Sequence, residues 1–283
     1  MLETTNNLSI MKKIFLVSVI AMMVFAVNAS AQLSVGVGYV NETVVSKEAA
    51  VYTDIYSGYS WGKDRLQLNG FYIEAMYNWD FANAGPGVFA LQSGFKYNCL
   101  TNVDHVSRTN MRYEENDAAV SIKGTARERV SDHFIDIPVH FKYVYDIAPG
   151  VVSAYAFAGP VLSLGLAAKS TKFTKANTVF ENGSVLVHNV ERYNAYTGHY
   201  YVKTYDENAN KYNIKKGKND QYKAYSMFDL KFALGLGVTI SEKLDIKFAY
   251  NIGLLNRAFI KADKDHKYSV HSNVLYFGAA YNF

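Results

Sequence analysis

The sequence predicts an all-β protein, an eight-stranded antiparallel up-and-down transmembrane β-barrel with long extracellular loops and short periplasmic turns. Apolar and polar residues alternate with period two over segments long enough to cross a membrane as tilted strands. Long and short connections follow one another strictly along the chain. The 283 residues include 23 Tyr and 17 Phe but only 4 Pro. Together these features are typical of a chain that crosses an outer membrane as strands.

Residues 1–31 have the features of a cleavable signal peptide. Lys12 and Lys13 precede an apolar run over residues 14–27, and Ala29-Ser30-Ala31 offers small residues to signal peptidase. The apolar run is shorter than the roughly 20 residues that a helix needs to span a bilayer. We expect Gln32 to be the mature N-terminus, and Met11 is an alternative start. Residues 32–283 then form the barrel domain.

The first four expected strands cover residues 33–39, 71–81, 89–98 and 135–145. Each places large apolar side chains on one face and small or polar ones on the other. In the second strand, Phe71 and Ile73 oppose Tyr72 and Glu74. Pro138 is an irregularity in the fourth strand because proline cannot donate to a ladder. The alternation continues on both sides of it, so we keep the strand.

The last four expected strands cover residues 151–166, 228–240, 244–254 and 275–283. The first of these is the weakest, because Tyr155 and Phe157 mark one apolar parity while Leu162 and Leu164 mark the other. A bulge near Gly159-Pro160 would reconcile the two halves. The other three alternate without interruption.

The connections between these strands alternate in length. They cover residues 42–68, 82–87, 101–130, 146–150, 167–225, 241–243 and 258–270. An even-stranded barrel with short turns on one side of the membrane and long loops on the other produces this order. A soluble eight-stranded barrel has no reason to separate its loops in this way.

The polar parity of the strands identifies the inside of the barrel. It combines Gly and Ala with paired opposite charges, which suits a narrow interior better than a solvated surface. The turn after the second strand would place Glu74 directly opposite Lys96. We therefore predict an interior ion-pair network of Glu74, Lys96, Asp136, His140, Lys142, Asp229, Lys231, Asp245 and Lys247.

The aromatic residues at strand ends support an outer-membrane location. Trp79, Phe81, Tyr143, Tyr145, Tyr281 and Phe283 fall near the expected periplasmic boundary, where aromatic girdles lie. The last strand, NVLYFGAAYNF, looks like the assembly signal of outer-membrane barrels, carried by Tyr281 and Phe283. It implies the barrel-assembly machinery as a partner, beside outer-membrane lipid and lipopolysaccharide.

Two segments resemble the PorT-like outer-membrane barrel proteins of Bacteroidetes. FIDIPVHFKY, residues 134–143, matches a strand of the form aromatic-x-x-IP-x-x-x-K-Y, and AYAFAGPVLSLGL, residues 154–166, matches the following GP strand. The resemblance implies an outer-membrane barrel. It does not imply the secretion role of the family's namesake, because no functional motif carries over.

The connection over residues 167–225 is rich in tyrosine and lysine. An alternating stretch over 184–190 and a turn-like stretch over 206–210 suggest a sheet that protrudes above the membrane as a continuation of the flanking strands. Exposed tyrosine clusters suit recognition. The candidate surface-binding residues, for an unknown extracellular ligand, are Tyr193, Tyr196, Tyr200, Tyr201, Tyr205 and Tyr212.

Catalytic motifs are weak in this sequence. Gly58-Tyr59-Ser60-Trp61-Gly62 matches a nucleophile elbow in letters but lies in a loop without a helical pattern after it. Asp132-His133 falls at the outer rim, where a solvated pair is the simpler interpretation. The seven histidines are scattered, Cys99 is the only cysteine, and the net charge of +4 does not suggest nucleic acid. We expect no cofactor and no metal.

Three functions remain open on the sequence alone. The first is a non-enzymatic surface barrel for adhesion, ligand binding or envelope integrity. The second is a transport or secretion-accessory barrel, although eight strands leave an interior filled by side chains rather than a wide pore. The third is a barrel enzyme that modifies lipid or peptide at the rim.

Overall fold

The computed structural model describes residues 31–47, 64–102, 105–115, 118–180, 183–206, 210–259 and 269–283. Residues 1–30 of the expected signal peptide and the motif at residues 58–62 lie outside the described residues. The described chain is an antiparallel sheet of twelve strands. None of its helices is long and apolar enough to cross a membrane.

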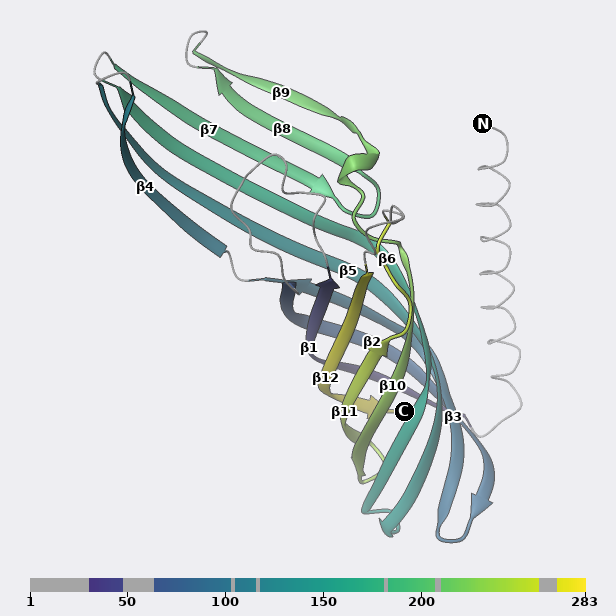
Figure 1. Ribbon diagram of the computed structural model, residues 1–283. Coiled ribbons are helices and arrows are strands. Elements are labelled where there is room, and N and C mark those ends of the chain that lie inside the picture. Colours follow the sequence, from purple (N-terminus) through teal and green to yellow (C-terminus); the bar gives the residue numbers. More distant parts are fainter. Residues whose placement is uncertain are drawn as a thin grey trace, which may run out of the picture.

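Eight of the strands close into a ring, visible in the lower part of Figure 1. Its order is β1, β2, β3, β5, β6, β10, β11, β12 and back to β1, with β5–β6 and β1–β12 as the pairs that complete it. The strands of the ring are β1 Ala31–Lys47, β2 Asp64–Ala84, β3 Gly87–Thr101, β5 Ala118–Ala148, β6 Val152–Phe180, β10 Phe228–Ile240, β11 Leu244–Gly253 and β12 Ser269–Asn282.

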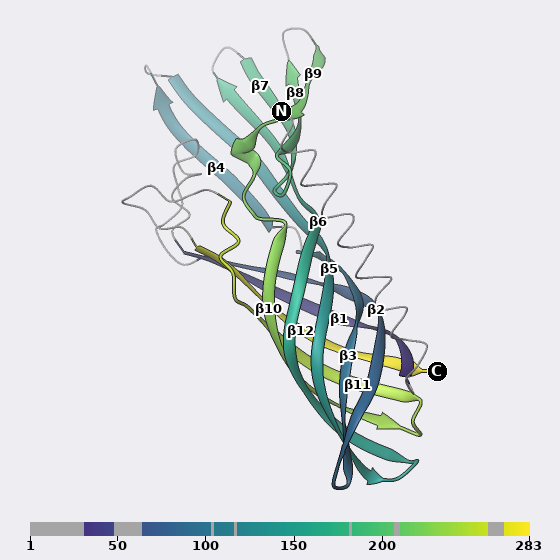
Figure 2. The same cartoon turned by 90° about the vertical axis from the view of Figure 1, so that its right-hand side faces the viewer.

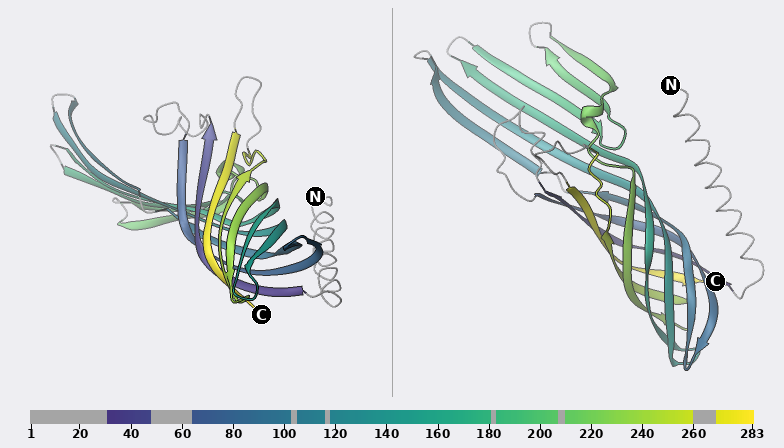
Figure 3. Two further views of the ribbon diagram at one scale, coloured as in Figure 1. Left: turned by 90° about the horizontal axis from the view of Figure 1, so that it is seen from below. Right: turned by 45° about the vertical axis from the view of Figure 1, so that its right-hand side comes forward.

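The remaining strands form an extension above one end of the ring. They are β4 His105–Glu115, β7 Gly183–Asn194, β8 His199–Asp206 and β9 Lys211–Lys218, followed by a short 3-10 turn, η2 Asp220–Tyr222. The upper parts of β5 and β6 run on from the barrel wall to carry β4 on one side and β7–β8–β9 on the other (Figure 2). Figure 3 shows that this sheet projects well away from the barrel.

The extension corrects the expected loops. Residues 101–130 and 167–225 were expected as connections, yet most of them are strands. The sheet above the membrane was expected to continue from residues 151–166 and 228–240. The strand over 151–166 does continue, as β6, but its partner is β5, since β10 begins only at Phe228. A strand with water on both faces lacks the alternation of outward apolar and inward polar residues on which the expectation relied.

The burial of side chains in the ring is the reverse of that in a soluble protein. In β10, Phe232, Leu234 and Leu236 are 38%, 49% and 61% exposed, whereas Asp229 and Lys231 are 2% and 1% exposed. The same alternation runs through β11 and β12. A wall with apolar side chains outside and charges inside is the arrangement that lipid around a barrel favours.

The bulge predicted near Gly159-Pro160 in the fifth expected strand is wrong. From residue 152 to 164, β6 pairs with β10 without a shift of register. Tyr155 and Phe157 point inward and are buried, while Leu162 and Leu166 point outward. The two rings fit inside because β10 presents Gly235 and Gly237, where a Cβ atom would meet the ring atoms of Phe157 and Tyr155 respectively.

Pro138 is accommodated within β5 as expected. The ladder to β3 skips the residues opposite Pro138 and resumes at Asp136 in the same register. The Ser93 hydroxyl donates to the Pro138 carbonyl at 2.7 Å, so this carbonyl has a hydrogen-bond partner where the ladder is interrupted. The register shifts between β5 and β6 lie elsewhere, at His133/Phe134 and Asp146/Ala148.

Candidate functional site

The barrel interior holds all nine residues that were predicted to form its polar network, and each of them is buried. They come from β2, β3, β5, β10 and β11, because the inward parity of every strand is polar or small. The structure divides them into local groups. Besides ion pairs, these groups contain hydrogen bonds from tyrosine hydroxyls to carboxylates and contacts of lysine ammonium groups with aromatic rings.

The first group centres on Glu74. The observed register places Glu74 directly opposite Lys96, as the length of the β2–β3 turn predicts. Lys96 Nζ lies 3.5 Å from Glu74 Oε2. The nearer ammonium is that of Lys247, from β11 across the interior, which ion-pairs with the other carboxylate oxygen. One carboxylate therefore pairs with two lysine ammonium groups.

The second group centres on Asp136 of β5. Its carboxylate lies 3.6 Å from Lys231 Nζ and accepts a hydrogen bond from the Tyr276 hydroxyl at 2.7 Å. Tyr276 packs edge-on against Tyr72, with ring centroids 5.3 Å apart. Lys96 Nζ lies 3.9 Å from the centroid of the Tyr276 ring and thereby links the two groups.

The direct contacts of the other predicted residues are with neutral groups. Asp245 accepts a hydrogen bond from the Tyr155 hydroxyl at 2.8 Å, and Lys142 Nζ lies 3.7 Å from the centre of the same ring. His140 stacks on Phe157 and lies 3.3 Å from Gln92. Asp229 accepts a hydrogen bond from Ser272 at 3.3 Å. The single network that was expected is therefore a set of linked polar clusters.

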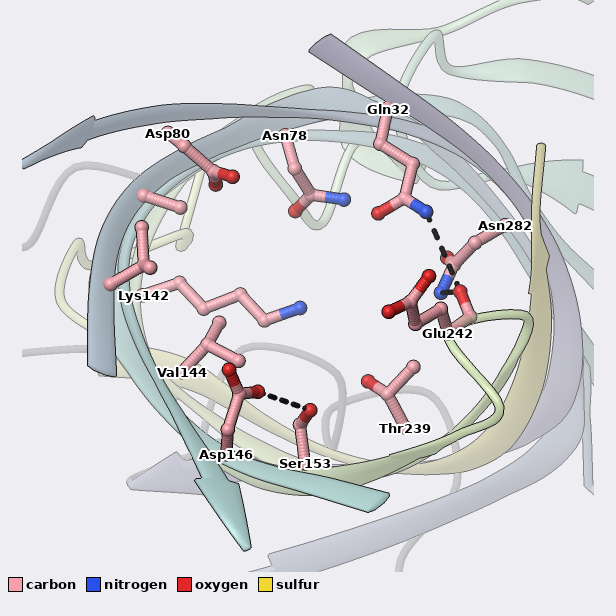
Figure 4. A pocket seen from close by; sticks show the side chains of 12 residues that line it. Gln32, Asn78, Asp80, Lys142, Val144, Asp146, Ser153, Thr239, Glu242 and Asn282 are labelled. Carbon is pink, nitrogen blue, oxygen red and sulfur yellow. Dashed lines mark hydrogen bonds between the residues drawn. The ribbon is translucent and has the colours of Figure 1, made fainter. Parts of the chain in front are cut away.

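A polar pocket of about 280 Å³ opens at the end of the barrel where the short turns lie. Figure 4 shows Lys142 reaching into it from one wall, with Asp80, Asp146 and Glu242 around its margin. Ser153 donates to Asp146 at 2.6 Å, and Asn282 donates to the Glu242 carbonyl at 3.1 Å. Above this pocket, Tyr155 and Phe157 fill the lumen.

The opposite mouth is closed by a cluster of buried side chains that sequence reasoning did not predict. Arg257, from the segment after β11, turns into the barrel and contacts Glu42 at 3.2 Å and Asp132 at 3.8 Å. Tyr196, from the turn between β7 and β8, donates to Asp132 at 2.8 Å and accepts from Arg257 at 2.7 Å. All four side chains are buried. We call Glu42, Asp132, Tyr196 and Arg257 the mouth cluster.

The mouth cluster corrects two predictions. Asp132 was interpreted as solvated and Tyr196 as part of a binding surface, yet they are only 4% exposed each. Burial raises the pKa of the Tyr196 phenol well above its ordinary value, and the nearby Asp132 adds to this. Tyr196 therefore stays neutral and remains the hydrogen-bond donor to Asp132. Glu42 and Arg257 carry a weak signal in the sequence, since each is a charge beside a strand end.

Asp132 and His133 do not form a catalytic pair. They are neighbours in one strand, so their side chains point to opposite sides of the wall. Asp132 faces the mouth cluster, while the His133 ring lies 2.8 Å from the Tyr97 hydroxyl on the outer side. Within the described ranges, no group of three or more His, Cys, Asp or Glu is placed to hold a metal ion.

The candidate surface tyrosines other than Tyr196 lie on the extension. Tyr212 is 42% exposed, and Tyr193, Tyr200, Tyr201 and Tyr205 are half-buried. Several stack on one another: Tyr205 lies 5.1 Å from Tyr212, and Tyr193 and Tyr200 lie 5.7 and 5.2 Å from Tyr222, measured between ring centroids. An open groove of about 620 Å³ lies at the base of β6, β7 and β8.

The terminal aromatics of β12 face outward beside the seam between the first and last strands. Tyr281 and Phe283 are 46% and 73% exposed, and their ring centroids are 5.1 Å apart. The Phe283 amide donates to the Leu33 carbonyl at 2.9 Å and adds a bond to the β1–β12 pair.

Comparisons with known proteins give distant similarities only. No family model and no curated protein matches the chain. Similar solved structures include Ail, the attachment invasion locus protein of Yersinia pestis, in complex with the heparin analogue sucrose octasulfate. That match has 12% identity, a TM-score of 0.30, and covers 89% of this chain and 99% of Ail.

Two further matches are more distant still. Neisserial surface protein A is 10% identical with a TM-score of 0.27, covering 90% and 99% of the two chains. A Pseudomonas aeruginosa FadL homologue is 9% identical with a TM-score of 0.24, covering 90% of each. These neighbours are bacterial outer-membrane β-barrel proteins. At such scores they carry no argument, and the fold described above rests on the strand pairing of this chain.

Proposed function

We propose that this chain is a non-enzymatic integral protein of the bacterial outer membrane, which presents its extension at the cell surface for binding or for envelope integrity. The observation that carries this proposal is the reversed burial of the eight-stranded ring, with apolar side chains outside and charges inside. The resemblance of residues 134–143 and 154–166 to PorT-like barrels supports the same location. The expected signal peptide, with Gln32 as the mature N-terminus, fits it as well.

The filled lumen favours this function over a diffusion pore. Tyr72, Tyr276, Tyr155 and Phe157 occupy the middle of the barrel, and the mouth cluster closes one end. Single-channel conductance of the purified barrel in planar bilayers tests this difference. We expect no stable open current, whereas a reproducible conductance would favour the transport alternative.

The cellular experiment is fractionation of the native host. The protein should be recovered with outer membranes, migrate faster on a gel before heating than after, and begin at Gln32 by mass spectrometry. Recovery as a soluble periplasmic species would contradict the proposal. A changed lipid A mass profile in a deletion strain would point to the rim enzyme instead.

A further inference from the structure

The sheet of the extension has two chemically different faces. Pairing places Arg129 opposite Thr171, Thr171 opposite Arg192, and Arg192 opposite Tyr201. Residues that pair directly share a face of the sheet. The cationic members of this face include Arg129, Lys169, Arg192, Lys203, Lys216 and Lys218. We call it the cationic face.

Carboxylates are absent from the cationic face over the strand segments whose side chains the structure describes. The described positions are residues 125, 127, 129 and 131 of β5 and the segments 169–175, 188–194, 199–205 and 212–218. Glu191 lies on the opposite face, because its neighbour Arg192 is on this one. Residues 167–225 carry ten Lys and Arg against five Asp and Glu, a net charge of +5, while the whole chain has +4. The positive charge of the protein is thus concentrated in the extension.

The cationic face continues the lipid-facing wall of the barrel. In β5, the outward residues Phe141 and Val139 are followed higher in the strand by Arg129. In β6, the outward residues Leu162 and Leu166 are followed by Lys169, because the register shift at His133/Phe134 moves the outward parity by one. Lys169 therefore lies about 10 Å along the strand from Leu166. This distance is comparable to the depth of the headgroup layer, which adds roughly 5–8 Å to each side of the apolar core.

The groove at the base of the extension collects the groups that a phosphorylated sugar needs. Lys169, Arg192 and His199 line it together with Thr171, Asn194 and Tyr201. The Arg192 guanidinium lies 5.8 Å from the centre of the Tyr201 ring, which holds it in place. Lys and Arg bind phosphate oxygens, while hydroxyl and amide groups bond sugar hydroxyls. A volume of about 620 Å³ is in the usual range for a small-ligand site.

We propose that the cationic face binds the phosphorylated sugars of lipopolysaccharide in the barrel's own membrane, with Lys169 and Arg192 as the phosphate contacts in the groove. The inference rests on the proposed function, because it requires the extension to stand above an outer membrane. The inference adds lipopolysaccharide as the binding partner of the extension. Charge complementarity and the position directly above the apolar wall favour this ligand over a molecule that arrives from the medium.

The test is a titration of the whole mature barrel, in neutral detergent, with deacylated lipopolysaccharide oligosaccharide. The groove variant is Lys169→Gln/Arg192→Gln. The matched control is Lys211→Gln/Lys215→Gln, which removes the same charge from exposed residues on the opposite face of β9. We expect the groove variant to bind about tenfold more weakly or worse, and the control to stay within about twofold of the parent protein. Heat-modifiable migration shows that each variant is folded.

Measurements on the unaltered protein test the proposal without any variant. Removing the phosphates from the oligosaccharide should weaken its binding, and so should raised salt. Equal affinity for the dephosphorylated oligosaccharide, or an equal loss in the two variants, would overturn the proposal. A third result would separate it from the proposed function. If a sulfated polysaccharide bound through Lys169 and Arg192 while lipopolysaccharide oligosaccharide did not, surface binding would stand and this partner would be wrong.

Discussion

At the scale of single residues, Glu74 shows how the interior balances its charges. Its carboxylate contacts both Lys96 and Lys247, whereas Lys96 also lies over two tyrosine rings. The two partners of the Glu74–Lys96 pair are therefore unequal. Removing Glu74 leaves two buried ammonium groups without their carboxylate, while removing Lys96 leaves Glu74 paired with Lys247.

We predict that Glu74→Gln lowers the free energy of unfolding by about 3–5 kcal/mol, and that Lys96→Met lowers it by clearly less. The double variant should be more stable than the sum of the two losses implies, since the two side chains interact. Denaturant unfolding in lipid or detergent measures all three. Strictly additive losses would show that Glu74 and Lys96 do not interact.

Gly235 is the second residue whose surroundings predict an effect. A Cβ atom there would lie 2.1 Å from Phe157 Cζ, too close for any side chain. Gly235→Ala should therefore destabilise the barrel by about 1–3 kcal/mol through overpacking. Phe157→Leu in the same protein should recover part of the loss. Gly217→Ala, where the nearest atom is the Tyr200 hydroxyl at 3.1 Å, is the control and should cost little. No recovery by Phe157→Leu would contradict this packing.

The same residues show where sequence reasoning succeeds and where it stops. The charges of the interior could be predicted because they alternate with apolar residues along each strand. Tyr155 and Phe157 were assigned to the wrong face because the glycines that make room for them belong to another strand. Tyr196 and Arg257 could not be placed, because their burial depends on how two connecting segments fold into the mouth.

At the scale of elements, Arg257 joins the segment after β11 to β1, β5 and the β7–β8 turn. Burial by itself would lower the pKa of the Arg257 guanidinium, but the surrounding Tyr196, Glu42 and Asp132 raise that pKa. Arg257→Met should strand two buried carboxylates and destabilise the protein by about 3–5 kcal/mol. Arg257→Lys keeps the charge and should cost less. Equal unfolding curves for the parent and Arg257→Met would show that the mouth cluster contributes no stability.

The β1–β12 seam is the element that closes the ring. Phe283 extends the pair through its amide and presents its ring to the outside. We predict that Phe283→Asp lowers the amount of heat-modifiable barrel in cells, because the last strand carries the expected assembly signal. Tyr212→Asp, an exposed aromatic on β9 outside the ring, is the matched control and should leave the amount unchanged. Normal levels of Phe283→Asp would rule out a role for this residue in assembly.

At the scale of the whole molecule, the barrel follows from the alternation of apolar and polar residues along each strand, which decides the residues that face outward and inward. The eight ring strands could be located from alternation alone, since lipid outside and a packed polar interior impose opposite demands on neighbouring residues. The extension could not be drawn in detail, because both of its faces are wet and cross-strand pairing decides its shape. The cationic face could not be predicted from the sequence, because only the strand pairing shows that Lys169, Arg192 and Tyr201 lie on one face.

The central claim is that the apolar parity of the ring faces lipid. The most direct test attaches a spin label at Phe232→Cys, Leu234→Cys or Leu236→Cys of β10, each in a Cys99→Ser background and reconstituted in bilayers. The relaxation of the label is then measured with oxygen, which concentrates in lipid, and separately with a water-soluble nickel complex. We predict strong relaxation by oxygen and little by nickel at all three positions. Strong relaxation by nickel at all three would contradict the claim, because these side chains would then face water.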